Sequence, residues 1–226
     1  YKLVTGVQTC ALPIFSEAIK KWYTSLFKSV ETEIRGILTE KWEDESIETF
    51  QKNLSHLLMT RPEYGKKILG IDPGYRTGCK IVVLDILGNP LTFSKIFLDT
   101  PSEAEKVLRS IIEKYTPDVV VIGNGTGWDE TVELVQTLSS LPIFIVNESG
   151  ASVYSASEAA QEEFPDLDVT DRWTISIARR YIDPLSELVK IPVGSIWVGM
   201  YQHDIAEKKL EERLGYTVED TVNMVG

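Results

Sequence analysis

The spacing of hydrophobic positions first indicates a helical segment. Over residues 15–59, apolar side chains recur at steps of three and four, which is the period of an amphipathic helix. Three helices are predicted, over residues 16–30, 31–38 and 46–59. Pro62 follows the last of them and disfavours helix at the residue before it. We therefore expect a helical bundle that leads into the next domain.

A different pattern begins at residue 67, where short apolar runs are typical of buried strands. Strands are predicted over residues 67–72, 79–87, 91–97, 118–123 and 141–146. The Gly-Asn-Pro turn at residues 88–90 joins the second and third strands as a hairpin. Helices are predicted over residues 101–115, 128–138, 151–161 and 170–182. After residue 190 the chain is irregular, and a charged helix is predicted over residues 204–214 with Gly215 as its C-cap.

This order of elements predicts an α/β fold. Three antiparallel strands are followed by helices that alternate with strands, and parallel strands need helical crossovers of one hand. The succession is that of the ribonuclease H-like fold, a mixed five-stranded sheet flanked by helices, here with an N-terminal helical segment. Asp72 would end the first, central strand of that sheet.

Asp72 is the first candidate for chemistry. The Pro73-Gly74 pair turns the chain directly after it, because proline has no N–H for the sheet and glycine accepts positive φ. A carboxylate beside such a turn suits the binding of a divalent metal or a place near phosphate. An ordinary hairpin turn capped by an aspartate would have the same sequence.

Composition narrows the class of protein. The chain has 226 residues, 43% of them hydrophobic and 25% charged, which is ordinary for a globular protein. A net charge of −11 argues against a protein that coats nucleic acid, but it allows a local basic face. No apolar run approaches the ~20 residues that cross a bilayer, so no membrane partner is expected. Cys10 and Cys79 form no disulfide framework, which favours the cytoplasm, and together with two histidines they do not give the pattern of a zinc site.

The first fourteen residues stand apart from the rest. Their string VQTCALPI resembles the translated sequencing-adapter scars found at the ends of fragmentary gene models. They also lack the charged start and long apolar core of a signal peptide. We expect residues 1–14 to be non-native or disordered, and a scar at this place would make the chain a fragment.

Several motifs together resemble one family. The strings IDPGYRTG, VVVIGNGT, NESGASVYSASE, FPDLDV, SIARR, DPLSELVKI and YQHD occur in the order found in the Tex family of bacterial transcription accessory proteins, whose ribonuclease H-like module is of the YqgF type. The resemblance covers roughly residues 15–226. It implies a nucleic-acid-binding protein, RNA in particular, that works near the transcription machinery and is not a hydrolase.

The predicted divisions follow from the pattern and the resemblance. A helical segment covers residues 15–63, and a YqgF-type domain covers residues 64–183. Residues 184–226 form a helical connector, truncated before the helix-hairpin-helix domain that would follow in that family.

A nuclease on this fold would need several acids at strand ends, because carboxylates there hold two metal ions. Asp72 provides one, and Glu148 follows the fifth strand and could reach the same edge. The fourth strand ends in Gly123-Asn124, where a Holliday-junction resolvase of the RuvC kind would have a glutamate; Asn124 could ligate through its amide oxygen but brings no charge. Asp171 is a third candidate, although Asp171 and Asp168 could simply favour a helix N-terminus. We predict a vestigial site without nuclease activity, which requires no cofactor.

Two alternatives stay open. The first is a metal-dependent nuclease or resolvase, in which Asp72 and Glu148 would hold Mg²⁺. In the second, the turns DPG and GNGTG would cradle phosphate as in actin-like ATPases, but those proteins need a duplicated domain and no internal repeat is visible. The candidate contacts to nucleic acid are Arg76, Lys80, Arg172 and Arg179. For Arg179, pairing with a neighbouring acid is the alternative.

Overall fold

The computed structural model describes residues 4–225, with side chains from residue 12 onward. The chain divides into two compact units, Tyr1–Glu48 and Thr49–Gly226. Helix α1 spans Val4–Leu58 and so provides the described part of the first unit and the start of the second. Among the described residues, no helix has both the length and the apolar character to cross a membrane.

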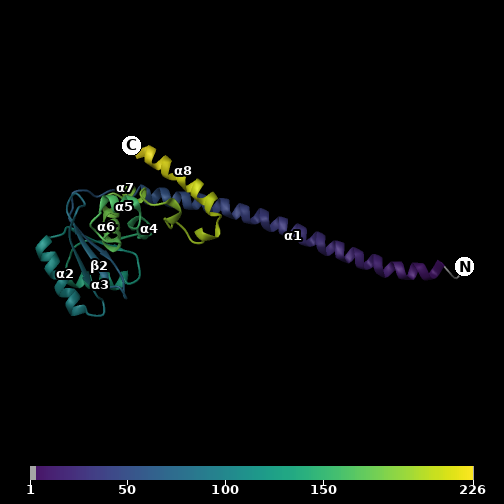
Figure 1. The fold of residues 1–226 in the computed structure, drawn as a ribbon, viewed down its shortest axis with the longest axis horizontal. Helices are drawn as coiled ribbons and strands as arrows, with labels where there is room; N and C mark the ends of the chain where they lie inside the picture. Colours follow the sequence, from purple (N-terminus) through teal and green to yellow (C-terminus); the bar gives the residue numbers. More distant parts are fainter. Residues whose placement is uncertain (1–3, 226) are drawn as a thin grey trace. The chain divides into compact units, whose positions relative to one another are not determined.

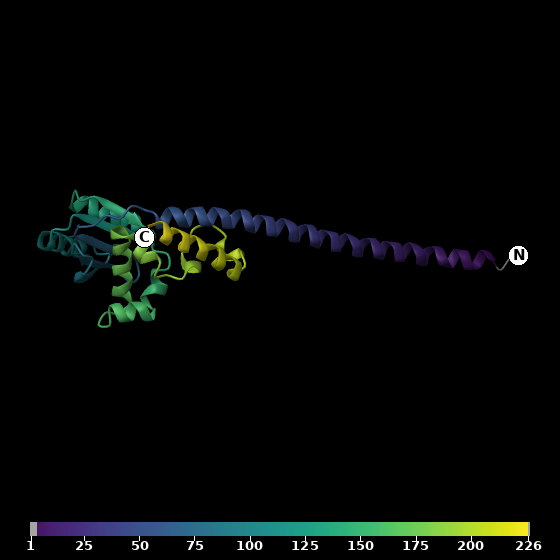
Figure 2. The same cartoon turned by 90° about the horizontal axis from the view of Figure 1, so that it is seen from above.

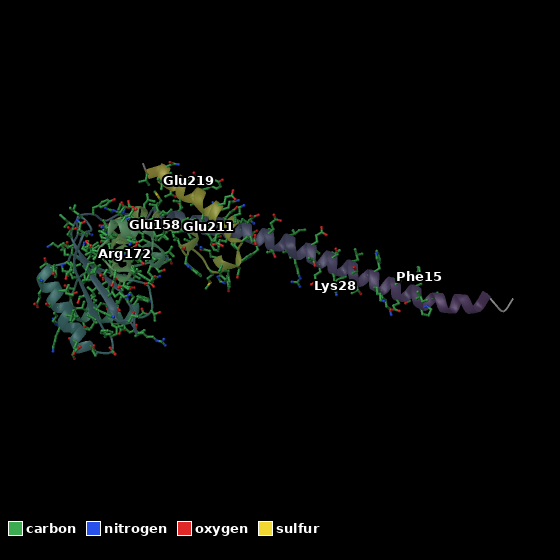
Figure 3. The ribbon with its side chains drawn as sticks, in the orientation of Figure 1. Phe15, Lys28, Glu158, Arg172, Glu211 and Glu219 are labelled. Atoms are coloured by element: carbon green, nitrogen blue, oxygen red, sulfur yellow. The ribbon has the colours of Figure 1, made fainter. Side chains whose placement is uncertain are left out.

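The prediction of three helices before residue 60 is wrong, because α1 is continuous. The Thr32 hydroxyl donates to the Lys28 carbonyl at 2.8 Å across the first expected interruption, and Lys41 pairs with Glu45 at 3.8 Å within the second. The bundle is therefore absent from the described residues, and large apolar side chains along the first unit are exposed, as the sticks in Figure 3 show. Residues 4–14 belong to α1, residues 1–3 lie outside the described residues, and the adapter origin of the segment stays a prediction.

The second unit is built on a five-stranded sheet in the order β3-β2-β1-β4-β5. The strands are β1 Ile68–Asp72, β2 Cys79–Leu84, β3 Pro90–Ile96, β4 Val119–Gly123 and β5 Ile143–Val146. Strand β2 pairs antiparallel with both β1 and β3, whereas β4 pairs in parallel with both β1 and β5. This is the predicted ribonuclease H-like mixed sheet, with Asp72 at the end of the central strand.

Helices cover both faces of the sheet, as the two views show (Figures 1 and 2). On one face, α2 (Pro101–Tyr115) and α3 (Trp128–Leu138) pack against alternate strand residues such as Leu69 and Ile71. On the other face, α6 (Val169–Ile182) packs against Ile68 and Val121. The continuous apolar runs of β1 and β4 are thus explained by burial on both sides.

Shorter helices connect α6 to its surroundings. They are α4 Ala151–Ser155, α5 Glu158–Glu163 and α7 Pro184–Leu188, followed by the 3-10 turns η1 Val193–Ser195 and η2 Gln202–Asp204. The single helix predicted over residues 151–161 breaks at Ser157, whose Oγ accepts the Ala160 N–H and caps α5. The last helix, α8 (Glu207–Val225), continues through Gly215, so the predicted C-cap is wrong.

The final helix is fixed to the end of α1. The Gln51 side chain donates to the Arg213 carbonyl and to the Thr217 hydroxyl, both at 3.0 Å. Asn53 donates to the Val198 carbonyl at 2.7 Å. The connector after residue 183 is therefore a packed part of the second unit.

Candidate functional site

One glycine brings the carboxyl end of β1 against α6. A Cβ atom on Gly70 would lie 2.5 Å from the Cβ of Ala178, a distance at which carbon atoms clash, so only glycine lets the helix lie directly on the strand. Side chains alternate along a strand, and Asp72 therefore faces α6 as well. Only 6% of Asp72 is exposed.

Lys80 is the cross-strand neighbour of Asp72. The register of β1 with β2 pairs the two residues directly, and such partners share one face of the sheet. Lys80 Nζ lies 3.0 Å from Asp72 Oδ2. The same ammonium lies 5.7 Å from the centre of the Trp173 ring, which α6 supplies. A side-chain cation therefore occupies the space between Asp72 and α6.

The Glu148 carboxylate comes from the loop after β5 and lies at the edge of the sheet where β1 and β4 end. A Cβ on Gly123 would lie 2.8 Å from Glu148 Oε2, and a Cβ on Gly125 would lie 2.5 Å from Oε1. The absent side chains of these two glycines thus leave the space that the carboxylate fills. The Glu148 N–H donates to Asn124 Oδ1 at 3.1 Å, which fixes the loop. Glu148 Oε2 itself has no hydrogen-bond partner among the described residues.

Arg180 adds a second cation behind Glu148. Only 5% of this residue is exposed, and its Nη1 donates to the Asn147 carbonyl. Burial lowers the pKa of Arg180 to about 10, although the nearby charges of Glu187 and Glu148 act in the opposite direction. The guanidinium remains charged at neutral pH and partly offsets the negative charge of Glu148.

The acids of this edge are nevertheless short of positive charge. Burial raises the pKa of Asp72, and the Lys80 ammonium opposes that shift only in part. Burial and then the charge of Asp72 raise the pKa of Glu148. Burial and then the charge of Asp168 raise the pKa of Asp171. Each of these carboxylates would gain from another cation nearby.

Asp171 and Asp168 begin α6. Asp168 Oδ1 accepts the backbone N–H groups of Thr170 and Asp171 at 2.7 and 2.8 Å, so Asp168 is the N-cap. Among the described residues, no group of three or more Asp, Glu, His or Cys side chains is placed to hold a metal ion. Asp72 and Glu148 interact through their charges, but Asp171 does not complete a ligand set with them.

The residues at this edge do not fit a two-metal centre. Lys80 pairs with Asp72, and α6 presents the Trp173 ring to the same lysine. Gly123 ends β4 where a further carboxylate was expected, and Glu148 fills the space from another loop. The Lys80 contact and the Trp173 ring were not foreseen from the sequence. The spacing of Asp72 and Lys80 across a short turn was the available signal.

The four predicted basic contacts have different surroundings. Arg76 is exposed in the turn between β1 and β2. Lys80 pairs with Asp72, while Arg172, labelled in Figure 3, is 8% exposed and donates to the carbonyls of Leu167 and Ser155. Arg179 pairs with an acid, as its alternative interpretation expected. Binding of nucleic acid by these residues stays a prediction, and the geometry favours Arg76 among them.

Comparison with known proteins places this edge in a family domain. The model of the Tex protein YqgF-like domain matches residues 66–182, just over half of the 226 residues. The Bacillus subtilis (strain 168) protein called Uncharacterized protein YdcI is 45% identical over 235 residues, which cover 100% of this chain and 33% of that protein. Transcriptional accessory protein Tex of Neisseria gonorrhoeae is 43% identical over 211 residues, which cover 91% of this chain and 28% of that protein.

Among solved structures, the Thermus thermophilus RuvC structure aligns with a TM-score of 0.33 at 11% identity, over 69% of this chain and 96% of that chain.

The two sequence relatives are much longer, so this chain spans a third of their length or less. The family match runs from two residues before β1 to the end of α6 and includes the edge of Asp72, Lys80 and Glu148. The chain belongs to the Tex family, and its second unit contains the YqgF-like domain of that family.

Proposed function

We propose that this chain is a nucleic-acid-contacting module of a Tex-type transcription accessory protein, and that its ribonuclease H-like edge binds without cleaving. The observation that carries the proposal is the Lys80 ammonium 3.0 Å from Asp72 Oδ2. Nucleases of this fold activate water with metal ions held at that strand end. With a lysine on the central acid, the edge lacks the group that would generate the nucleophile.

The proposed setting is transcription in the cytoplasm, with RNA as the expected nucleic acid. The name of the gonococcal relative, Transcriptional accessory protein Tex, supports this setting. Other parts of longer relatives would contribute to the activity of a whole protein, because this chain spans only 28% of that relative.

Two exposed cations flank the edge and are the proposed phosphate contacts. Arg76 lies in the turn that follows Asp72, and Lys95 lies on β3 opposite Lys80 in the sheet register. The Lys95 side chain passes the same turn, because a Cβ on Gly78 would lie 2.8 Å from Lys95 Cε. Phosphate contacts of this kind position a strand without selecting its sequence.

The binding test measures the anisotropy of labelled single-stranded RNA and DNA as protein is added. The double variant Arg76→Ala/Lys95→Ala should lower affinity by about tenfold and reduce the salt slope by about two. Lys106→Ala/Lys114→Ala removes two exposed cations from α2, on the opposite face of the sheet, and is the matched control. An equal loss in the control, or no binding by the parent chain, would rule out this contact surface.

The competing function is a metal-dependent nuclease that uses Asp72 and Glu148. One observation favours it, since these carboxylates lie within electrostatic reach of each other. The test incubates the chain with single-stranded, hybrid and branched substrates in Mg²⁺ and in Mn²⁺. We expect no cleavage. Cleavage that Asp72→Asn abolishes would establish the nuclease and overturn the proposed function.

A further inference from the structure

We propose that Lys80 is a built-in counter-ion that replaces a divalent cation at this edge, so that its removal turns Asp72 and Glu148 into a divalent-cation site. The inference rests on the proposed absence of nuclease activity and gives that absence a cause. It concerns cation binding and can therefore be tested without measuring cleavage.

The position of Lys80 is set by the sheet. The register of β1 with β2 places Lys80 directly opposite Asp72, and Nζ meets Oδ2 at 3.0 Å. The side chains are 21% and 8% exposed, so the pair is largely withdrawn from water. On its other side the ammonium faces the Trp173 ring at 5.7 Å. The cation is held between a strand end and a helix, as a bound metal ion would be.

The carboxylates around Lys80 together carry more negative charge than one lysine can neutralise. The electrostatic field of Lys80 acts on Asp72 and also on Glu148, Asp168 and Asp171. Lys80 contacts only Asp72 directly, at 3.0 Å, and acts on the other three carboxylates from farther away, while Arg180 acts on Glu148 and Glu187. Removing Lys80 would leave these acids with a strong excess of negative charge, which a divalent cation would relieve.

The remaining ligands are sufficient for weak coordination. Mg²⁺ is often held by one or two carboxylates, with water completing its shell. Glu148 Oε2 has no hydrogen-bond partner among the described residues, so it is free to serve as a ligand. Two acids can thus act where the described residues provide no group of three.

The test titrates the full chain with Mn²⁺ at pH 8 and follows the paramagnetic resonance signal of the free ion. Lys80→Ala should bind one Mn²⁺ at least about tenfold more tightly than the parent chain, because a repelling positive charge is removed. Added Mg²⁺ should displace it. Equal Mn²⁺ affinity of the parent chain and Lys80→Ala would overturn the inference.

Two further variants make the result specific. Lys106→Ala removes an exposed lysine from α2, on the opposite face of the sheet, and should leave Mn²⁺ affinity unchanged. Asp72→Asn/Lys80→Ala should lose the gained site. If thermal unfolding shows that Lys80→Ala does not fold, Lys80→Gln keeps a polar side chain of similar length and should show the same gain.

The outcome is separable from that of the proposed function. Asp72-dependent cleavage by the parent chain would defeat the proposed function. A folded Lys80→Ala or Lys80→Gln variant that binds Mn²⁺ no better than an inactive parent chain would defeat only the counter-ion role.

Discussion

Two charge clusters contact α6, and they are neutralised very differently. At the Glu163 cluster, the Tyr154 hydroxyl donates to Oε2 at 2.5 Å, Lys190 Nζ lies 3.1 Å from the same oxygen, and Arg179 pairs with Oε1. Burial would raise the pKa of Glu163, but these donors outweigh it and lower the pKa to about 2. At the Asp72 edge, one lysine serves several acids, and the pKa values of Asp72, Glu148 and Asp171 are raised.

The difference shows that the ratio of donors to acids separates a structural cluster from a candidate site. Several donors on one carboxylate stabilise its charged form and fasten α4, α5 and α6 together. Several carboxylates around one lysine leave charge uncompensated, which costs stability and favours an incoming cation. Carboxyl pKa values that are raised, as at the Asp72 edge, are the perturbation expected at functional sites.

The largest change in the free energy of unfolding is expected when the Glu163 cluster is broken. Glu163→Ala should lower the free energy of unfolding by about 2 kcal/mol at pH 7, because the Tyr154 hydroxyl loses its acceptor and Arg179 and Lys190 keep only Glu187 as a shared partner. Urea denaturation at pH 7 measures the change. A loss below about 0.5 kcal/mol, the range of an ordinary surface substitution, would show that the cluster does not fasten the fold.

The same variant should show a defined dependence on pH. A carboxyl whose folded pKa is depressed adds stability above its unfolded pKa, and that stability is lost as pH falls through the folded value. For Glu163 the window runs from its ordinary pKa of 4.5 down to about 2. The stability difference between parent and Glu163→Ala should therefore shrink across this window. A difference that stays constant to pH 2 would contradict the lowered pKa.

Tyr154→Phe tests a single donor of the same cluster. The ring is buried and its hydroxyl donates to Glu163 at 2.5 Å, so the variant loses one charge-assisted hydrogen bond and keeps the packing. We expect a loss of about 1.5 kcal/mol in urea denaturation, less than for Glu163→Ala because Arg179 and Lys190 remain. A loss as large as that of Glu163→Ala would mean that Tyr154 organises the whole cluster.

The sheet and most of its helices could be predicted from the sequence because burial on both faces leaves continuous apolar runs. The mixed five-stranded sheet with β1 at its centre and helices α2 and α3 agree with expectation. The errors fall where local signals compete. Gly215 is a common helix stop, yet no atom lies within 4 Å of a Cβ built there, and α8 continues through it at a propensity cost of about 1 kcal/mol.

The candidate site was only partly predictable. Asp72 and Glu148 were expected at one sheet edge, and their charges do interact. Lys80 was predicted as a nucleic-acid contact, whereas its ammonium pairs with Asp72. That pairing depends on strand register, which hydrophobic pattern alone does not give. The Trp173 ring near Lys80 depends on the packing of α6 on Gly70, which is likewise a property of three dimensions.

Neutralising Asp72 should change the free energy of unfolding less than breaking the Glu163 cluster does, and it should raise that free energy instead of lowering it. Asp72→Asn keeps the shape of the side chain and removes a charge whose burial is disfavoured, as its raised pKa indicates. Lys80 can turn toward water, since its side chain is 21% exposed. We expect a gain of up to about 1 kcal/mol in thermal or urea unfolding at pH 7. A loss of stability larger than that would show that the Asp72–Lys80 pair stabilises the fold, as the Glu163 cluster does.

The smallest expected effect concerns pH dependence at Glu148. A carboxyl whose folded pKa is raised disfavours the fold while it is ionised, so the parent chain should gain stability as pH falls through that raised value toward 4.5. Glu148→Gln removes the titration and should flatten the stability curve by a few tenths of a kcal/mol between pH 7 and 4.5. Glu133→Gln, on the exposed side of α3, changes the same group away from the edge and is the control. If Glu148→Gln instead steepened the curve, the fold would stabilise the charged form of Glu148. The Asp72 edge would then resemble the Glu163 cluster, and its acids would not need a further cation.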